Sequence, residues 1–253
     1  MRMTNAPARA IGIDIGGTGM KAGVVDLAEG ALVGDRVRIP TPEGALPRDV
    51  LETARQLVEL LGDDARDLPI GVCFPAIVKD GITLSAANVS VEWIGLDADD
   101  LFGKALGRDI HFVNDADAAG LAEAKFGAAR DQAGLTIMTT LGTGIGSAFL
   151  YNGVLVPNTE LGHLQWDGES IERYASASAR ERGDIPWDEW SARLQKFFAH
   201  VEFLFSPDLI VVGGGVSKNP EKFLPGIETR APIVTAVHRN NSGIIGAASL
   251  VLT

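Results

Sequence analysis

The chain has 253 residues, 46% hydrophobic and 22% charged, an ordinary composition for a globular protein with one large or two modest domains. Its formal net charge of −11 argues against nucleic acid as the main partner, although a local basic groove could still bind a polyanion. No apolar run approaches the ~20 residues of a membrane-spanning helix, and residues 1–9 lack a signal-peptide core, so we expect a cytoplasmic protein.

The first predicted element is a hairpin, with strands at residues 10–15 and 22–27. Its turn, Gly16-Gly-Thr18, can take positive φ and expose backbone N–H groups that suit a phosphate. Asp14, directly before the turn, could hold a metal ion or its water shell. A plain hairpin turn without a ligand remains the alternative.

The remainder of the first half alternates strands with amphipathic helices. Cys73, the single cysteine, excludes an internal disulfide and is expected to be a buried, inert thiol. The predicted elements are a strand at 32–39, a helix at 46–61, a strand at 68–74, loop or short irregular strand at 76–95, a helix at 99–106, a strand at 109–113 and a helix at 117–126.

The second half begins with another strand pair and contains the longest predicted helix. The predicted elements are strands at 135–141, 145–151 and 154–156, a helix within 170–182, a helix at 187–205 with Pro186 in its first turn, a strand at 208–212, a helix near 219–224, a strand at 232–237 and a helix at 242–252.

Two glycine turns repeat at a fixed offset. Gly17-Thr-Gly19 and Gly142-Thr-Gly144 lie 125 residues apart, each between apolar strands, which predicts a duplicated α/β fold with a central cleft. Gly213-Gly-Gly215 is a third flexible turn, after a buried strand. We expect a small lobe at 1–114, with the C-terminal helix at 242–253 packing back on it, and a large lobe at 115–241.

Polar residues at the predicted strand ends are candidates for chemistry. Asp115 could accept a proton from a substrate hydroxyl while Asn114 fixes orientation, although Asn114-Asp115 could equally cap the next helix. Glu160, His163 and Glu172 suit a polyol, whose hydroxyls need both donors and acceptors. The four tryptophans could stack on a sugar, but core packing is the default interpretation: Trp93, Trp166, Trp187 and Trp190.

Together these motifs resemble the repressor–open-reading-frame–kinase (ROK) family of sugar kinases, which have the two-lobed actin/hexokinase-like (ribonuclease H-like) fold. The resemblance covers nearly the whole chain and is closest to the polyphosphate-dependent glucokinases. It is carried by Asp14-Ile-Gly-Gly-Thr18, Asn88 within 81–95, Asn114-Asp115, Leu141-Gly-Thr-Gly-Ile-Gly146, Glu160-Leu-Gly-His163, Gly213-Gly-Gly215 and Asn241-Ser-Gly-Ile-Ile-Gly-Ala-Ala248.

The resemblance implies transfer of a phosphoryl group from polyphosphate, and in some relatives ATP, to the 6-hydroxyl of glucose or mannose. It makes Asp115 the general base and places Mg²⁺ near Asp14, through water if not directly. The implied sugar contacts are Asn88, Asn114, Asp115, Glu160, His163 and Glu172. The implied phosphate-binding residues are Asp14, Gly16, Gly17, Thr18, Gly19, Lys21, Gly142, Thr143, Gly144, Gly213, Gly214 and Gly215.

One departure concerns zinc. Many family members carry a Cys-x-Cys-Gly segment after the Glu-x-Gly-His motif, whereas Gln165–Ser170 here contains no cysteine, so no zinc site is expected. The resemblance favours a homodimer. The alternatives are an ATP-only glucokinase and a sugar-responsive DNA-binding regulator. The second is disfavoured because only nine residues precede Ala10 and the chain is acidic. Seven cations are candidates for a polyphosphate groove: Lys21, Lys79, Lys125, Lys218, Arg173, Arg180 and Arg182.

Overall fold

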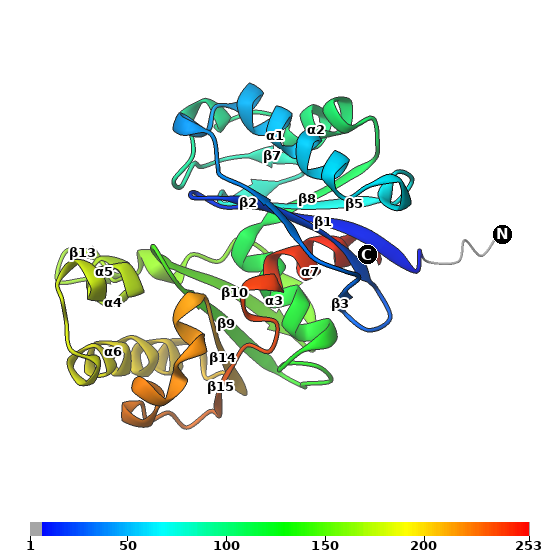
Figure 1. Ribbon diagram of the computed structural model, residues 1–253. Helices are drawn as coiled ribbons and strands as arrows, with labels where there is room; N and C mark the ends of the chain where they lie inside the picture. The colour runs from blue at the N-terminus through cyan, green and yellow to red at the C-terminus, as the bar shows by residue number, and fades with distance from the viewer. Residues whose placement is uncertain (1–6, 253) are drawn as a thin grey trace. The chain divides into compact units, whose positions relative to one another are not determined.

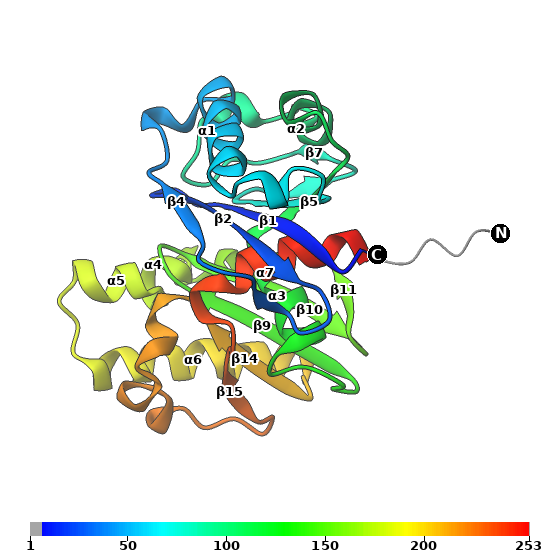
Figure 2. The same cartoon turned by 45° about the vertical axis from the view of Figure 1, so that its right-hand side comes forward.

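The computed structural model describes residues 7–252. The chain divides into two compact units, each with its own central sheet (Figures 1 and 2). Unit 1 comprises Met1–Ala118 and Asn241–Thr253, and unit 2 comprises Ala119–Asn240. Within the described range, no helix is long and apolar enough to cross a bilayer.

Unit 1 is built on a sheet with the strand order β3-β2-β1-β5-β8, and β4 also pairs with β2. β1 pairs antiparallel with β2, whereas β1, β5 and β8 run parallel. The strands of this sheet are β1 (Arg9–Ile15), β2 (Met20–Asp26), β3 (Ala31–Leu32), β4 (Val37–Ile39), β5 (Ile70–Phe74) and β8 (Ile110–Asn114). A short separate hairpin joins β6 (Val78–Lys79) and β7 (Ile82–Thr83).

Side-chain alternation assigns the two faces of this sheet. Ile11, Ile13 and Ile15 of β1 lie in a core shared with α1 (Pro47–Leu60) and α2 (Ala98–Leu106). The intervening residues of β1, including Gly12 and Asp14, therefore point to the opposite face. There α7 (Ser242–Ser249), red in Figure 1, packs against β1 and β5.

Backbone-to-backbone packing of α7 explains three glycines. A Cβ on Gly12 of β1 or Gly71 of β5 would overlap the carbonyl oxygens of Ile244 or Ala247, respectively. A Cβ on Gly246 of α7 itself would overlap the carbonyl oxygen of Ala118. The absence of side chains at Gly12 and Gly71 lets α7 lie directly on the sheet, and the absence of one at Gly246 lets α7 approach the backbone of Ala118.

Unit 2 repeats the strand order of unit 1. Its sheet runs β11-β10-β9-β14-β15, with β9 and β10 antiparallel and β9, β14 and β15 parallel. The central strands of both sheets thus follow the same hairpin-then-parallel pattern, as the sequence repeat predicts. The strands are β9 (Leu135–Leu141), β10 (Ile145–Tyr151), β11 (Val154–Val156), β14 (Leu209–Gly213) and β15 (Ile233–Thr235), with a small hairpin of β12 (Gln165–Trp166) and β13 (Glu169–Ser170).

A large apolar core joins the unit 2 sheet to α6 (Trp187–Phe205), whose buried side chains include Trp190, Leu194 and Phe198. A smaller cluster lies on the other sheet face, where Ala119 of α3 (Asp115–Phe126) contacts Met138 and Val211. Two short helices, α4 (Glu172–Ala175) and α5 (Ala177–Arg182), precede α6.

Three sequence predictions of secondary structure require correction. The strand at 32–39 is two short strands, because Val33–Arg36 with Gly34 at φ +79° interrupts it. The helix within 170–182 is split at Ser176, whose extended backbone and side chain cap α5. The helix near 219–224 is wrong: this segment forms two single-turn 3₁₀ helices at 220–222 and 224–226.

Candidate active site

The first glycine turn connects β1 and β2 in unit 1. Gly16 donates its N–H to the carbonyl of Gly19 at 3.2 Å, which closes the turn. A Cβ on Gly17 would lie 2.9 Å from Cβ of Asn88, so the predicted sugar contact and the predicted phosphate turn are neighbours. Arg38 donates to the carbonyl of Thr18 at 3.1 Å, adding a cation that the sequence analysis did not propose.

Asp14 lies on the sheet face that α7 covers. Its Oδ2 accepts from Lys21 Nζ at 2.7 Å, in a half-buried ion pair. A Cβ on Gly243, at the start of α7, would lie 2.8 Å from its carboxyl carbon, so this acidic group sits where the helix dipole favours a negative charge. Burial raises the pKa of the neighbouring Cys73 thiol, and the charges of Asp14 and Asp115 raise it further. Cys73 is therefore a buried thiol, as predicted.

The donor set around Asp14 limits how it could hold a metal. Among the described residues, no group of three or more His, Cys, Asp or Glu side chains could hold a metal ion. Mg²⁺ commonly keeps several waters and needs only one or two carboxylates besides phosphate oxygens. Asp14, with one oxygen bound to Lys21, fits the water-mediated role rather than that of a complete metal cage.

Asn114 and Asp115 mark the junction of β8 and α3. The Asn114 side-chain oxygen accepts from the N–H groups of Ala116 at 2.8 Å and Asp117 at 3.2 Å, and its amide donates to the carbonyl of Ala76 at 2.9 Å. The helix-cap interpretation of Asn114 is therefore confirmed. This cap fixes the position of Asp115, whose side chain is exposed at the first residue of α3.

In unit 2, two of the predicted phosphate turns line one pocket of about 450 Å³. Gly142 and Thr143 contribute the β9–β10 turn, and Gly215 contributes the turn after β14. Ser178 of α5 donates its N–H to the carbonyl of Gly142 at 3.1 Å, which anchors α5 beside the first turn. A Cβ on Gly142 or Gly215 would meet nothing within 4 Å, so both backbones are open to a ligand.

Glu172 connects the second glycine turn to the predicted sugar contacts. Its Oε2 accepts from Ile145 N at 3.2 Å and occupies the space that a side chain on Gly144 would need. A Cβ on Gly162, in the Glu160–His163 motif, would lie 3.1 Å from the same oxygen. Glu160 Oε2 and His163 Nε2 are 4.0 Å apart. Unit 2 therefore brings Glu160, His163 and Glu172 together.

Burial raises the pKa of the Glu160 carboxyl, and the charge of Glu172 acts in the same direction, while His163 opposes it. The ionised form of Glu160 is thus held in partly desolvating surroundings, where a hydrogen bond from a ligand hydroxyl would be strong. This property is typical of binding carboxylates at functional sites.

Gly16, Gly17 and Thr18 do not take the positive φ that the sequence allowed for the first glycine turn. Of the glycines in the three turns, only Gly214 has a left-handed φ, at +86°. Several of the others have close neighbours instead: Gly17 approaches Asn88, Gly144 approaches Glu172 and Gly213 approaches Met138. Gly142 and Gly215 face open space. The sequence pattern therefore located the turns, but the reason for glycine at most positions is a close neighbour.

The tryptophans follow the default interpretation in two cases. Trp93 and Trp190 are fully buried and donate their indole N–H to the carbonyls of Ala45 and Ala175, both at 3.0 Å. Trp187 instead lines the unit 2 pocket together with Arg180. Sequence reasoning gave Trp187 no phosphate-site role, because helix periodicity alone does not distinguish a pocket wall from core.

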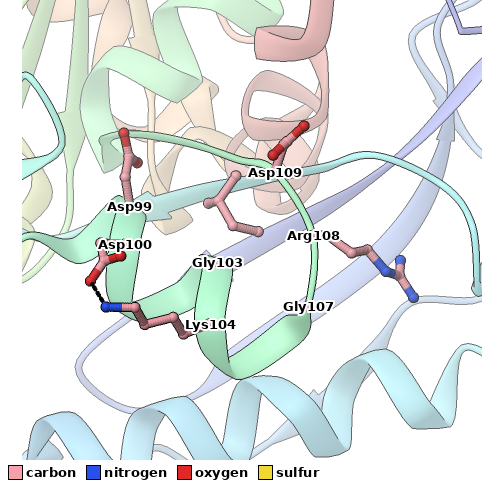
Figure 3. A pocket seen from close by; sticks show the side chains of 8 residues that line it. Asp99, Asp100, Gly103, Lys104, Gly107, Arg108 and Asp109 are labelled. Carbon is pink, nitrogen blue, oxygen red and sulfur yellow. Dashed lines mark hydrogen bonds and ion pairs between the residues drawn. The ribbon is translucent and has the colours of Figure 1, made fainter.

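A second hollow, of about 640 Å³, lies between α2 and the start of β8 in unit 1 (Figure 3). None of the predicted site residues lines it. Two of its charged groups are engaged locally: Lys104 pairs with Asp100 at 2.5 Å, and Arg108 donates to the carbonyls of Ala65 and Leu68. Oδ1 of Asp99, in contrast, is buried without a hydrogen-bond partner. This hollow is not associated with the candidate site.

The chain belongs to the ROK family, whose model matches residues 10–184. It is 43% identical over 238 residues to the polyphosphate glucokinase of Mycobacterium tuberculosis (strain CDC 1551 / Oshkosh), covering 94% of this chain and 89% of that relative. The crystal structure of inorganic polyphosphate/ATP-glucomannokinase from Arthrobacter sp. strain KM matches with a TM-score of 0.94 and 52% identity, covering 97% and 99% of the two chains.

A ROK family glucokinase from Streptomyces griseus, solved with glucose and AMPPNP, has a TM-score of 0.81 at 24% identity, with 96% and 98% coverage, which supports the fold alone. The predicted α/β, actin/hexokinase-like fold is confirmed.

Proposed function

We propose that this chain transfers a phosphoryl group from inorganic polyphosphate to the 6-hydroxyl of glucose, giving glucose 6-phosphate. The observation that carries the proposal is the near-complete match to the Arthrobacter polyphosphate/ATP-glucomannokinase, at 52% identity over 97% of this chain. The curated polyphosphate glucokinases support the same reaction at 41–43% identity. ATP is an additional donor in this proposal, and mannose an additional acceptor.

Each predicted residue has a role in the proposed reaction. Asp115 accepts the proton of the sugar 6-hydroxyl as its oxygen attacks the terminal phosphorus. Asn88, Asn114, Glu160, His163 and Glu172 bind the sugar hydroxyls. Asp14 would hold Mg²⁺ through water, and that ion would supply positive charge to the phosphate oxygens.

The backbone amides of the glycine turns orient the donor and stabilise charge on the transferred group. Such positioning and electrostatic stabilisation supply most of the catalysis in phosphoryl transfer. The turns concerned are Gly16–Gly19 with Lys21, Gly142–Gly144 and Gly213–Gly215. The unit 2 pocket supports this role, because two of the turns line it with unobstructed backbone.

The other functions considered from the sequence are not favoured. The ATP-only glucokinase is not favoured, because the relatives with 43% and 52% identity to this chain are named as enzymes that use polyphosphate. A DNA-binding regulator is disfavoured because curated kinases match more than 90% of this chain, while the ROK transcriptional regulator found by structure is 19% identical and supports the fold alone.

The test is a donor assay with purified protein at equal Mg²⁺, using long-chain polyphosphate or ATP with glucose and then with mannose. The proposal requires glucose 6-phosphate to form from polyphosphate at a kcat/KM at least comparable with that from ATP. Formation from ATP alone would leave the ATP-only kinase as the function. Glucose 6-phosphate is a glycolytic intermediate, so cytoplasmic activity in a cell fractionation is expected.

We also propose a homodimer. Its support is the family resemblance and a strip of exposed apolar side chains at the edge of the unit 2 sheet: Tyr151, Val154 and Val156. Light scattering should give twice the mass of the chain, and Val154→Glu should reduce it to the mass of one chain.

A further inference from the structure

The wall of the unit 2 pocket carries a group of side chains that the proposed reaction does not use. α5 begins beside the Gly142 turn, and the chain then passes through Arg180 to Trp187 at the start of α6. Arg180, Glu181 and Trp187 all line the pocket with the glycine turns. A ligand held at the turns would therefore extend towards these three residues.

Arg180 covers the aromatic surface of Trp187. The guanidinium carbon is 3.9 Å from the centroid of the indole, well within the range of a cation–π interaction. The same guanidinium donates to the carbonyl of Ile185 at 3.3 Å, which helps to hold it there. Lys222 Nζ is 5.3 Å from the same centroid, so two cations converge on one ring.

This arrangement has consequences for what the pocket can bind. A nucleobase gains affinity by stacking on an exposed aromatic face, and here a cation already lies over that face. Among the charged residues that line the pocket, Arg180 is opposed by the single carboxylate of Glu181, and Lys222, which is not one of the lining residues, adds a second positive charge at the same ring. These cations instead attract a chain of phosphate groups. Guanidinium is well suited to phosphate because it presents several donors in a fixed plane.

We infer that Arg180, held on Trp187 and assisted by Lys222, determines donor specificity by binding the phosphate groups of polyphosphate beyond those at the glycine turns. The inference rests on the proposed function and assigns residues to the donor chain at that site. Among the seven cations proposed from the sequence, it selects Arg180, and it adds Lys222.

The experiment measures KM and kcat of the full chain with long-chain polyphosphate, tripolyphosphate and ATP, each with saturating glucose. Arg180→Gln should raise KM for long-chain polyphosphate roughly tenfold. The same variant should leave KM for tripolyphosphate within about twofold, and should leave KM for ATP unchanged or lower it, because the indole face is uncovered. Lys222→Gln should act in the same direction more weakly, and Arg180→Lys should retain part of the affinity.

Arg130→Gln is the matched control. Arg130 lies in the same unit, is exposed and pairs with Asp131 at 3.8 Å, but it does not line the pocket and is not among the cations proposed for the donor. Arg130→Gln should leave KM and kcat for all three donors unchanged. Unaltered kcat with ATP in Arg180→Gln shows that this variant is folded.

The outcomes separate the two proposals. Equal changes in KM for polyphosphate and ATP, or no change in either, would overturn the role of Arg180 while the proposed reaction stands. A wild-type chain that forms no glucose 6-phosphate from polyphosphate would overturn the reaction and this inference with it.

Discussion

Asp115 is the general base in the proposed reaction, and the Asn114 cap fixes its position at the first residue of α3. Asparagine at 115 could accept the same hydrogen bond from Ala116 N–H, which Asp115 Oδ1 accepts at 2.8 Å, so the local backbone should be preserved. It cannot take up the hydroxyl proton. We therefore predict that Asp115→Asn lowers kcat by roughly 10² or more while glucose binding, measured by calorimetry, changes little.

Asp100→Asn is the control for this variant. Asp100 is an exposed carboxylate of α2 that pairs with Lys104, and its loss should leave kcat unchanged. Near-normal turnover in Asp115→Asn would remove Asp115 from the role of base.

Glucose binding is expected to depend on pH through Glu160, because burial raises the pKa of its carboxyl. At a pH above its folded-state pKa, the ionised carboxyl of Glu160 therefore lowers the stability of the folded protein. This destabilisation decreases as the pH falls through the folded-state pKa and is absent below the ordinary value of about 4.5. Glucose binding should need the ionised form. We predict that KM for glucose rises with acidification at a pH above 4.5.

The variant Glu160→Gln tests the predicted effects of Glu160 on glucose binding and on stability. The variant should bind glucose more weakly at pH 7, lose the acid-side rise in KM, and unfold at the same temperature or higher because no buried charge remains. A variant that retains the acid-side rise would assign that titration to another group. A large loss of thermal stability would indicate that Glu160 is structural.

At the scale of elements, α7 depends on glycines for its contact with the unit 1 sheet. Gly71→Ala would force a methyl group into the carbonyl of Ala247, and neither backbone can move without displacing the helix. We predict a loss of about 1–3 kcal/mol or more in the free energy of unfolding, measured by urea denaturation. Because α7 begins beside Asp14, donor use should weaken as well.

Gly103→Ala provides the comparison within the same unit. Gly103 lies inside α2, and an added Cβ would lie 3.4 Å from the carbonyl oxygen of Arg108. Alanine favours a helix by up to about 1 kcal/mol over glycine, so this variant should be as stable as the parent or more so. Equal losses for the two variants would argue against the close packing of α7.

The sequence predicted elements best where local pattern decides them. The strands at 135–141, 145–151 and 154–156 and the helix at 187–205 have the predicted bounds, because alternation and helical periodicity there are uninterrupted. The helix near 219–224 was wrong because Pro220 and Pro225 restrict the backbone of a short segment. Ser176 similarly formed a cap where periodicity suggested a continuous helix.

The short motifs of the candidate site could be predicted from the sequence, but the residues that pack around those motifs could not. The glycine turns, Glu160, His163 and Glu172 follow from short patterns in the chain. Arg38 and Lys222 lie far in sequence from the groups that they approach, and no local pattern marks them. Gly243 belongs to the motif at 241–248, but the motif does not show that Gly243 packs against Asp14. Their positions depend on strand pairing and on the return of α7, which a single sequence does not specify.

At the scale of the whole molecule, the donor should leave a localised footprint. Polyphosphate added without glucose should slow backbone hydrogen exchange in the segments that line the unit 2 pocket, at residues 141–143, 177–181 and 215–219. The second half of α6 should be unaffected. The measurement is hydrogen–deuterium exchange by mass spectrometry over the full chain, with sulfate at equal ionic strength as the control.

Protection spread evenly over both units, or matched by sulfate, would contradict a built donor site in this pocket. Since the experiment requires no turnover, it separates donor binding from catalysis.

Unit 2 is one uninterrupted stretch of chain, whereas unit 1 includes residues from both ends of the sequence. On the ribosome, residues 119–240 emerge before α7, so the second unit can complete its core while the first still lacks the helix that covers Gly12 and Gly71. The surroundings of Asp14 are complete only after Gly243 has been synthesised and α7 has packed on the sheet. A nascent chain truncated before α7 would therefore expose that sheet face to chaperones, and ligand binding at Asp14 would be among the last properties acquired during synthesis.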